Sequence, residues 1–174
     1  MNIVAIGGGE RTPHVQKALE ITGAEAPKAL IIPTAASTYL SFAKKVAIYT
    51  KTFDDLGVAS EVLHDFDKIP SADEIAHKIG GASLLYTFGG NTPYMIQKMQ
   101  EHGTNKAIHD AIWAGKVHAG LSAGALLPFR YALSNPAKKP AEEQWDFELV
   151  QPNVNVIDAI ATAHANIHDP TING

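Results

Sequence analysis

The sequence predicts one α/β domain in which a mostly parallel sheet is covered by helices on both faces. Short apolar runs alternate with amphipathic helical segments, the rhythm of successive β-α-β units. Three of these runs end in glycine-bearing turns, as strands of such sheets do where a ligand approaches. The 174 residues suffice for one domain with a sizeable core, so we expect a single domain over residues 1–174.

Five apolar runs predict the strands of this sheet, and two later runs predict further strands. The first five are residues 2–6, 29–33, 58–63, 83–88 and 117–119. After Pro128 the rhythm changes, and an exposed polar loop is predicted over residues 134–140. The two later strands are expected at residues 147–151 and 157–163.

Amphipathic segments between the strands predict five helices, each ending at or near a glycine. They cover residues 13–22, 39–56, 72–79, 93–101 and 105–114. Ser71 is the expected N-cap of the third helix, with Glu74 as its capping-box partner. A further helix can open at Ala123, until Pro128 disturbs it.

Composition excludes several classes of function. A net charge of −4 with scattered Lys and Arg offers no basic stripe, so we expect no nucleic-acid partner. Without cysteine there is no disulfide, Cys-based zinc site or thiol nucleophile, which suits a reducing compartment such as the cytoplasm. Residues 2–6 form an apolar run too short for a signal peptide, and no run reaches the length of a membrane span.

The segment Gly120-Leu121-Ser122-Ala123-Gly124 has the pattern of a nucleophile elbow, a sharp turn between a strand and a helix. Glycine on both sides removes side chains that would collide with the neighbouring strand and helix. The helix that begins at Ala123 directs N–H groups toward negative charge formed at Ser122. The pattern therefore indicates an acyl-transferring hydrolase, although G-x-S-x-G also occurs in ordinary loops.

The three glycine-bearing turns, at residues 7–9, 89–92 and 120–124, predict one shared site, because the carboxyl ends of parallel strands meet at one edge. The first turn lacks the last glycine of a dinucleotide fingerprint, and no P-loop is present. We therefore expect no nucleotide cofactor and no metal.

A serine elbow needs two donors for the oxyanion that forms during acyl transfer. One is the backbone N–H of Ala123, and a glycine of the Gly89-Gly90 pair fits as the second, because glycine lets the backbone approach a substrate closely. In the structural alternative these glycines only make the turn into the next helix, with Thr92 as its N-cap.

A histidine is the expected base for Ser122. Of eight histidines, four lie on predicted helices, His64 belongs to a strand end, and His118 is expected to pack within the strand before the elbow. His164 and His168 remain, where an apolar strand gives way to polar loop residues. The residues alone leave the choice between them open.

The turns at residues 6–9, 88–92 and 120–125, in this order and spacing, resemble peptidase family S51, which includes dipeptidase E and cyanophycinase. The resemblance implies a three-layer sandwich of the class I glutamine amidotransferase-like fold, with flavodoxin-like topology. It further implies Ser122 as nucleophile and a site with Gly89, Gly90, Asn91 and Ala123 for the oxyanion and substrate. Small peptides, such as those with an N-terminal aspartate, are the implied substrates.

The same resemblance implies a histidine in a stretch that reads proline-histidine-aromatic in the family. His168 is the better match and His164 the alternative, since the flanking proline and aromatic residue are absent. The family's triad acid lies further downstream, and neither Asp158 nor Asp169 occupies its position. We therefore expect that the C-terminal elements are missing, that the acid is replaced, or that the protein is not a working peptidase.

The favoured interpretation is a serine hydrolase of small peptides that uses Ser122 and His168. An α/β-hydrolase esterase shares G-x-S-x-G, but too few residues follow Ser122 for its later acid and histidine. The alternative from another class is a non-catalytic amidotransferase-like binding module. We also expect one apolar face of the parallel sheet to be left bare, which a second copy would cover in a homodimer.

Overall fold

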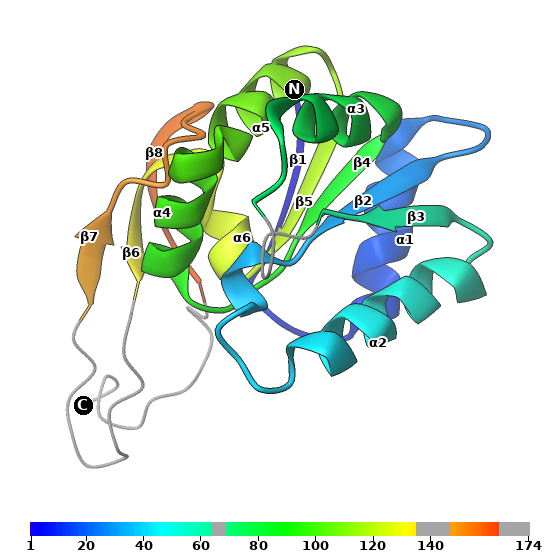
Figure 1. The fold of residues 1–174 in the computed structure, drawn as a ribbon, viewed down its shortest axis with the longest axis horizontal. Helices are drawn as coiled ribbons and strands as arrows, with labels where there is room; N and C mark the ends of the chain where they lie inside the picture. The colour runs from blue at the N-terminus through cyan, green and yellow to red at the C-terminus, as the bar shows by residue number, and fades with distance from the viewer. Residues whose placement is uncertain (64–68, 135–146, 164–174) are drawn as a thin grey trace.

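The computed structural model describes residues 1–63, 69–134 and 147–163. Its main sheet has five parallel strands in the order β1-β5-β4-β2-β3, as Figure 1 shows. All five predicted strands are present, with bounds that differ from the prediction by no more than two residues. They are β1 (Asn2–Ile6), β2 (Lys28–Ile32), β3 (Ala59–Val62), β4 (Leu84–Thr87) and β5 (Val117–Leu121).

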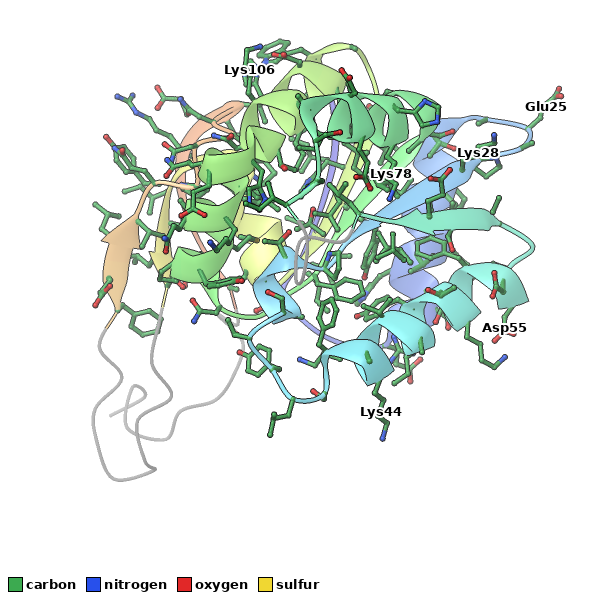
Figure 2. All side chains as sticks on the ribbon, viewed as in Figure 1. Glu25, Lys28, Lys44, Asp55, Lys78 and Lys106 are labelled. Carbon is green, nitrogen blue, oxygen red and sulfur yellow. The ribbon has the colours of Figure 1, made fainter. Side chains whose placement is uncertain are left out.

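The five predicted helices are also present, together with a short 3₁₀ turn, η1 (Thr34–Ala36), after β2. The Ser71 cap is confirmed, since the Glu74 N–H donates to Ser71 Oγ at 3.1 Å. In Figure 2 the side chains of Lys44, Asp55 and Lys106 point outward from their helices. The helices are α1 (Arg11–Thr22), α2 (Phe42–Asp55), α3 (Ala72–Gly81), α4 (Thr92–His102) and α5 (Thr104–Trp113).

Two apolar clusters, one on each face of the main sheet, confirm the three-layer α/β architecture. Leu85 of β4 packs in a cluster with residues of α3, α4 and α5. Its neighbours Leu84 and Tyr86 point to the other face and pack with residues of α1 and α2. The alternation in β4 thus buries both faces of the strand, as a continuous apolar run predicts.

A second sheet of three strands, β7-β6-β8, follows a short helix, α6 (Ala123–Leu126). β7 (Glu148–Val150) and β8 (Ile157–Thr162) match the two later predicted strands, but β6 (Phe129–Ser134) was not predicted. β6 pairs parallel to β8 and antiparallel to β7. The prediction of an exposed loop at Ser134 was wrong, because this residue ends β6 with 6% of its surface exposed.

One face of the small sheet is apolar and exposed. Leu133 of β6 lies opposite Leu149 of β7, and Tyr131 lies opposite Ile160 of β8, so these four side chains share a face. Leu133, Leu149 and Ile160 are 38%, 58% and 62% exposed, whereas Ala132 on the other face is buried. The bare face expected on the parallel sheet is not found, because helices pack on both of its faces. The exposed apolar face belongs to the small sheet instead.

None of the described helices is both long and apolar enough to cross a lipid bilayer.

Candidate active site

Ser122 occupies the one-residue turn between β5 and α6. Its backbone angles are φ 51° and ψ −113°, in a region that costs a non-glycine residue on the order of 1–3 kcal/mol. The turn is held on both sides, since the Ser122 N–H donates to the Ile6 carbonyl at 2.8 Å and its carbonyl accepts from the Ala125 N–H at 2.9 Å. The predicted strained strand-to-helix turn is confirmed.

The two glycines that flank Ser122 are required by close backbone packing. A Cβ added to Gly120 would lie 2.1 Å from the Gly124 carbonyl oxygen, and one added to Gly124 would lie 2.4 Å from the Thr87 carbonyl oxygen. Helix α6 therefore passes directly over the ends of β5 and β4, and only glycine leaves room for it.

Gly89 lies directly beside Ser122. A Cβ on Gly89 would be 2.7 Å from Ser122 Cβ and 3.4 Å from Ser122 Oγ. The sheet register explains the proximity, because Thr87 of β4 and Ile6 of β1 pair with Gly120 and Leu121 of β5. The turns after β1, β4 and β5 thus leave from one edge of the sheet, as their sequence positions predict.

The turn after β4 is held by η1. A Cβ on Gly90 would lie 2.0 Å from the Ala35 carbonyl oxygen, and that oxygen accepts the Asn91 N–H at 2.8 Å. The Asn91 side-chain oxygen accepts the Tyr94 N–H at 3.0 Å, so Asn91 is the N-cap of α4. The N-cap expected in the structural alternative, Thr92, is the first helical residue instead.

His118 is a core residue and not the base. It is fully buried in β5, with Nε2 3.1 Å from Thr87 Oγ1, as the sequence predicts for a strand histidine. Nδ1 is also buried and has no hydrogen-bond partner in the described part of the chain. Burial lowers the pKa of His118 to about 4, so the imidazole is neutral at physiological pH.

The other histidine and acid candidates divide between described and undescribed residues. His164, His168 and Asp169 lie outside the described residues, so their predicted roles stay predictions. Asp158 is described, and its Oδ1 lies 3.0 Å from Arg130 Nη1 at the surface of the small sheet, with 80% of its side chain exposed. Among the described contacts, the Asp158 carboxylate is therefore engaged by Arg130 at the surface.

A buried pair of hydroxyl groups joins the small sheet to the turn beside Ser122. Ser134 Oγ donates to Thr92 Oγ1 at 2.8 Å, and the two residues are only 6% and 3% exposed. Sequence analysis missed this contact because Ser134 was assigned to a polar loop. The pattern offers no local signal for it, since the contact depends on how β6 packs against α4.

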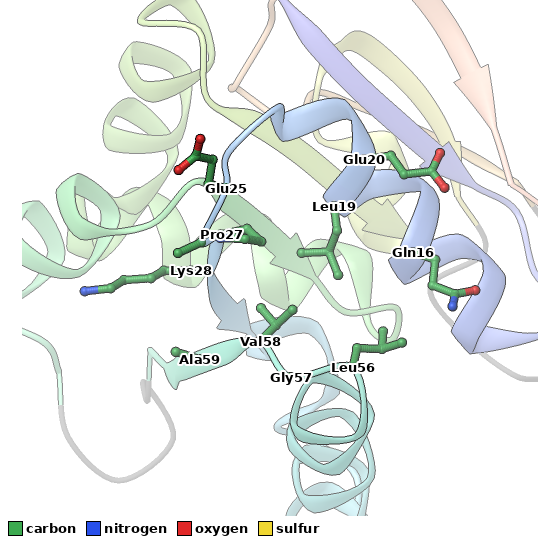
Figure 3. Close-up of a pocket in the computed structure, with 11 residues that line it drawn as sticks. Gln16, Leu19, Glu20, Glu25, Pro27, Lys28, Leu56, Gly57, Val58 and Ala59 are labelled. Atoms are coloured by element: carbon green, nitrogen blue, oxygen red, sulfur yellow. The ribbon is translucent and has the colours of Figure 1, made fainter.

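The described residues contain no candidate metal site, and a cavity among them lies away from Ser122. Within residues 1–63, 69–134 and 147–163, no cluster of three or more His, Asp or Glu side chains could hold a metal ion. A cavity of about 650 Å³ lies at the opposite edge of the sheet, where β2 and β3 begin. Figure 3 shows Leu19 and Val58 pointing into this cavity, while the Lys28 side chain extends away. The cavity is remote from Ser122, which lies at the carboxyl ends of the strands.

Comparison with solved structures shows the fold independently. The chain is similar to a peptidase from an acI-B1 actinobacterium, with a TM-score of 0.69 and 18% identity over 98% of this chain and 72% of the other. A glutamine amidotransferase aligns with a TM-score of 0.50 and 15% identity, over 80% of this chain and 59% of the other. These likenesses support the amidotransferase-like α/β fold.

Comparison of sequences identifies the family. The chain is 30% identical over 138 residues to the uncharacterized peptidase Lmo0363 of Listeria monocytogenes, covering 78% of this chain and 64% of that protein. A candidate peptidase E of the same species aligns at 27% identity with a TM-score of 0.58, over 74% of this chain and 61% of the other. In both cases the alignment spans less than two thirds of the relative. The family model for peptidase family S51 matches residues 3–156. The chain therefore belongs to peptidase family S51.

Proposed function

We propose that this chain cleaves small peptides by a serine mechanism in which Ser122 attacks the scissile carbonyl. The observation that carries the proposal is the strained backbone of Ser122 at φ 51°, held between β5 and α6 with Gly89 against its side chain. Strain of this kind persists only where the surroundings enforce it, and a nucleophile elbow is a known use for it. Family membership supports peptide substrates.

The tetrahedral oxyanion would be held by backbone N–H groups. Ala123 follows the nucleophile at the start of α6, and Gly89 and Gly90 form the turn beside it, so each is placed to contribute a donor. Asn91 would act through the same turn, because its backbone N–H is held by Ala35 and its side chain caps α4. These four residues are the proposed oxyanion and substrate site.

The geometry of the small sheet supports a base from the segment after β8. Thr162, the last residue of β8, pairs with Leu133, and the next residue of β6, Ser134, contacts the first residue of α4. The chain therefore leaves β8 near the turn at Gly89-Gly90. His164 and His168 follow Thr162 by two and six residues in the sequence, and an extended residue spans at most about 3.3–3.6 Å. We propose His168 as the base, with His164 as the alternative.

A second candidate function is a non-catalytic binding module that keeps this fold. The surface ion pair of Asp158 with Arg130 favours it, because it removes the one described acid considered for a triad. Without an acid behind the histidine, turnover would be about 10⁴-fold lower than in a complete triad. The strained serine favours the enzyme, because a binding module has no use for that strain.

A fluorophosphonate probe separates the two functions, since only an activated serine is labelled. We expect labelling of the wild-type chain, and complete loss of labelling and of dipeptide hydrolysis in Ser122→Ala with unchanged thermal unfolding. His168→Ala should remove both activities nearly as fully. Full activity of His168→Ala together with an inactive His164→Ala would move the base to His164. An unlabelled wild-type chain that hydrolyses no peptide would support the binding module.

A further inference from the structure

We infer that the hydrogen bond between Ser134 and Thr92 is a positioning device for the site, which holds the Gly89-Gly90 turn against Ser122. The inference rests on the proposed function for its catalytic consequence. Its structural basis is independent, because the two hydroxyl groups are buried and lie 2.8 Å apart.

The contact closes a ring of structure around the nucleophile. From Ser122 the chain runs through α6 into β6 and ends that strand at Ser134. Ser134 then donates to Thr92, and the backbone immediately before Thr92 leads back to Gly89, which touches Ser122. A shift of Thr92 would therefore be transmitted to the turn that carries the proposed oxyanion donors.

The other side of the turn is held by a different element. The Asn91 N–H donates to the Ala35 carbonyl of η1, and Gly90 packs against the same carbonyl. The turn is thus fixed from η1 on one side and from β6 on the other. Among these contacts, only the Ser134–Thr92 bond links the turn to the small sheet through side chains.

The same bond positions the exit of β8. Leu133, which precedes Ser134, pairs with Thr162 at the end of β8. Fixing the end of β6 on α4 therefore also fixes the point from which the histidine-bearing segment continues. The Ser134–Thr92 hydrogen bond thus connects the Gly89-Gly90 turn with the end of β8, the strand that precedes the proposed base in the sequence.

The test compares Thr92→Val and Ser134→Ala with two controls. Thr92→Ser keeps the hydroxyl group, and Thr52→Val removes a buried threonine hydroxyl on α2 that donates to the Ile48 carbonyl at 2.9 Å. The first readout is hydrogen exchange of the Asn91 amide, which needs no activity. We expect exchange at Asn91 to rise about tenfold or more in Thr92→Val and Ser134→Ala, and to stay at the wild-type rate in both controls.

The second readout is hydrolysis of a dipeptide. Misplaced oxyanion donors weaken transition-state binding more than substrate binding, so kcat should fall roughly tenfold to a hundredfold with little change in KM. The double variant should be no worse than either single variant, because all three lack the same bond. Thr92→Ser should keep the wild-type kcat.

The outcomes separate this inference from the proposed function. Wild-type exchange at Asn91 in both folded variants would overturn the inference, as would equal acceleration in Thr52→Val. If a variant unfolds, Ser134→Cys, which keeps a weak donor, replaces Ser134→Ala in the same comparison. A wild-type chain without turnover or probe labelling would overturn the proposed function, and exchange at Asn91 would still decide the role of the bond.

Discussion

Ser122 and His118 lie on the same short stretch of chain and differ completely in environment. Ser122 is partly exposed at the carboxyl end of the sheet, on a backbone that most residues avoid. His118 is fully buried within β5, where Thr87 supplies its one hydrogen-bond partner among the described residues. The two side chains differ in exposure because His118 lies inside β5, whereas Ser122 lies just beyond the carboxyl end of that strand.

The buried imidazole makes stability depend on pH. The pKa of His118 is about 4 in the folded chain and ordinarily 6.5, so the unfolded chain binds more protons between these values. Stability should therefore fall as pH drops from about 6.5 toward 4, with a contribution on the order of 3 kcal/mol. Urea unfolding across this pH range measures it.

Two variants isolate the contribution of His118. In His118→Gln, the free energy of unfolding should depend less steeply on pH between about 4 and 6.5, by the contribution of about one bound proton. His109→Gln, which changes a partly exposed histidine of α5, is the matched control. An unchanged slope in His118→Gln would show that another group causes the acid sensitivity.

At the scale of elements, the site is made by one short helix that crosses the ends of two strands. α6 has only four residues, and intrinsic helix stability at that length is negligible. It is formed because Ala123, Ala125 and Leu126 are buried and because Gly120 and Gly124 admit close backbone contact. Packing therefore determines this helix, and the two glycines permit the packing.

Two Gly→Ala substitutions should move stability in opposite directions. Gly124→Ala places a Cβ 2.4 Å from the Thr87 carbonyl oxygen, so we expect a loss of several kcal/mol, on the scale of overpacked cores. Gly80→Ala meets no atom within 4 Å on α3 and should stabilise by about 0.5–1 kcal/mol. Thermal unfolding of both variants tests this, and a stable Gly124→Ala would contradict the close approach of α6 to β4.

At the scale of the whole molecule, both sheets contribute residues to the candidate site around Ser122. The main sheet supplies the turn at Ser122 and the Gly89-Gly90 turn, and the small sheet supplies Ser134, which bonds to Thr92. The small sheet is buried on one face only, so its outer face presents Leu133, Leu149 and Ile160 to solvent. Exposed apolar patches of this kind mark interaction surfaces.

We expect the chain to self-associate through this outer face. Sedimentation velocity should show a concentration-dependent dimer that Ile160→Lys weakens at least tenfold. Lys106→Glu on α5, away from this face, should leave association unchanged, and a monomer at all concentrations would contradict the expectation.

Local sequence patterns predicted the strands and helices whose burial depends mainly on residues that are close together in the sequence. The five strands of the main sheet are apolar on both faces, and Ser71 with Glu74 marks a helix start, so each is evident from a few neighbouring residues. The elbow at Gly120–Gly124 is likewise recognisable, because a strained serine needs glycine on both sides. Sequence alone thus determined the α/β class, the main-sheet strands and the strained turn at Ser122.

Tertiary structure decided the parts that depend on contacts between distant segments. β6 was not predicted, because its burial comes from one face only and from partners that follow later in the chain. Asn91, rather than Thr92, caps α4, and the Thr92 hydroxyl group bonds to Ser134 instead. The physical reason is that a hydroxyl group or a half-buried strand gains its stabilisation from a partner that proximity along the chain does not reveal, so only the fold brings Ser134 and Thr92 together beside Ser122.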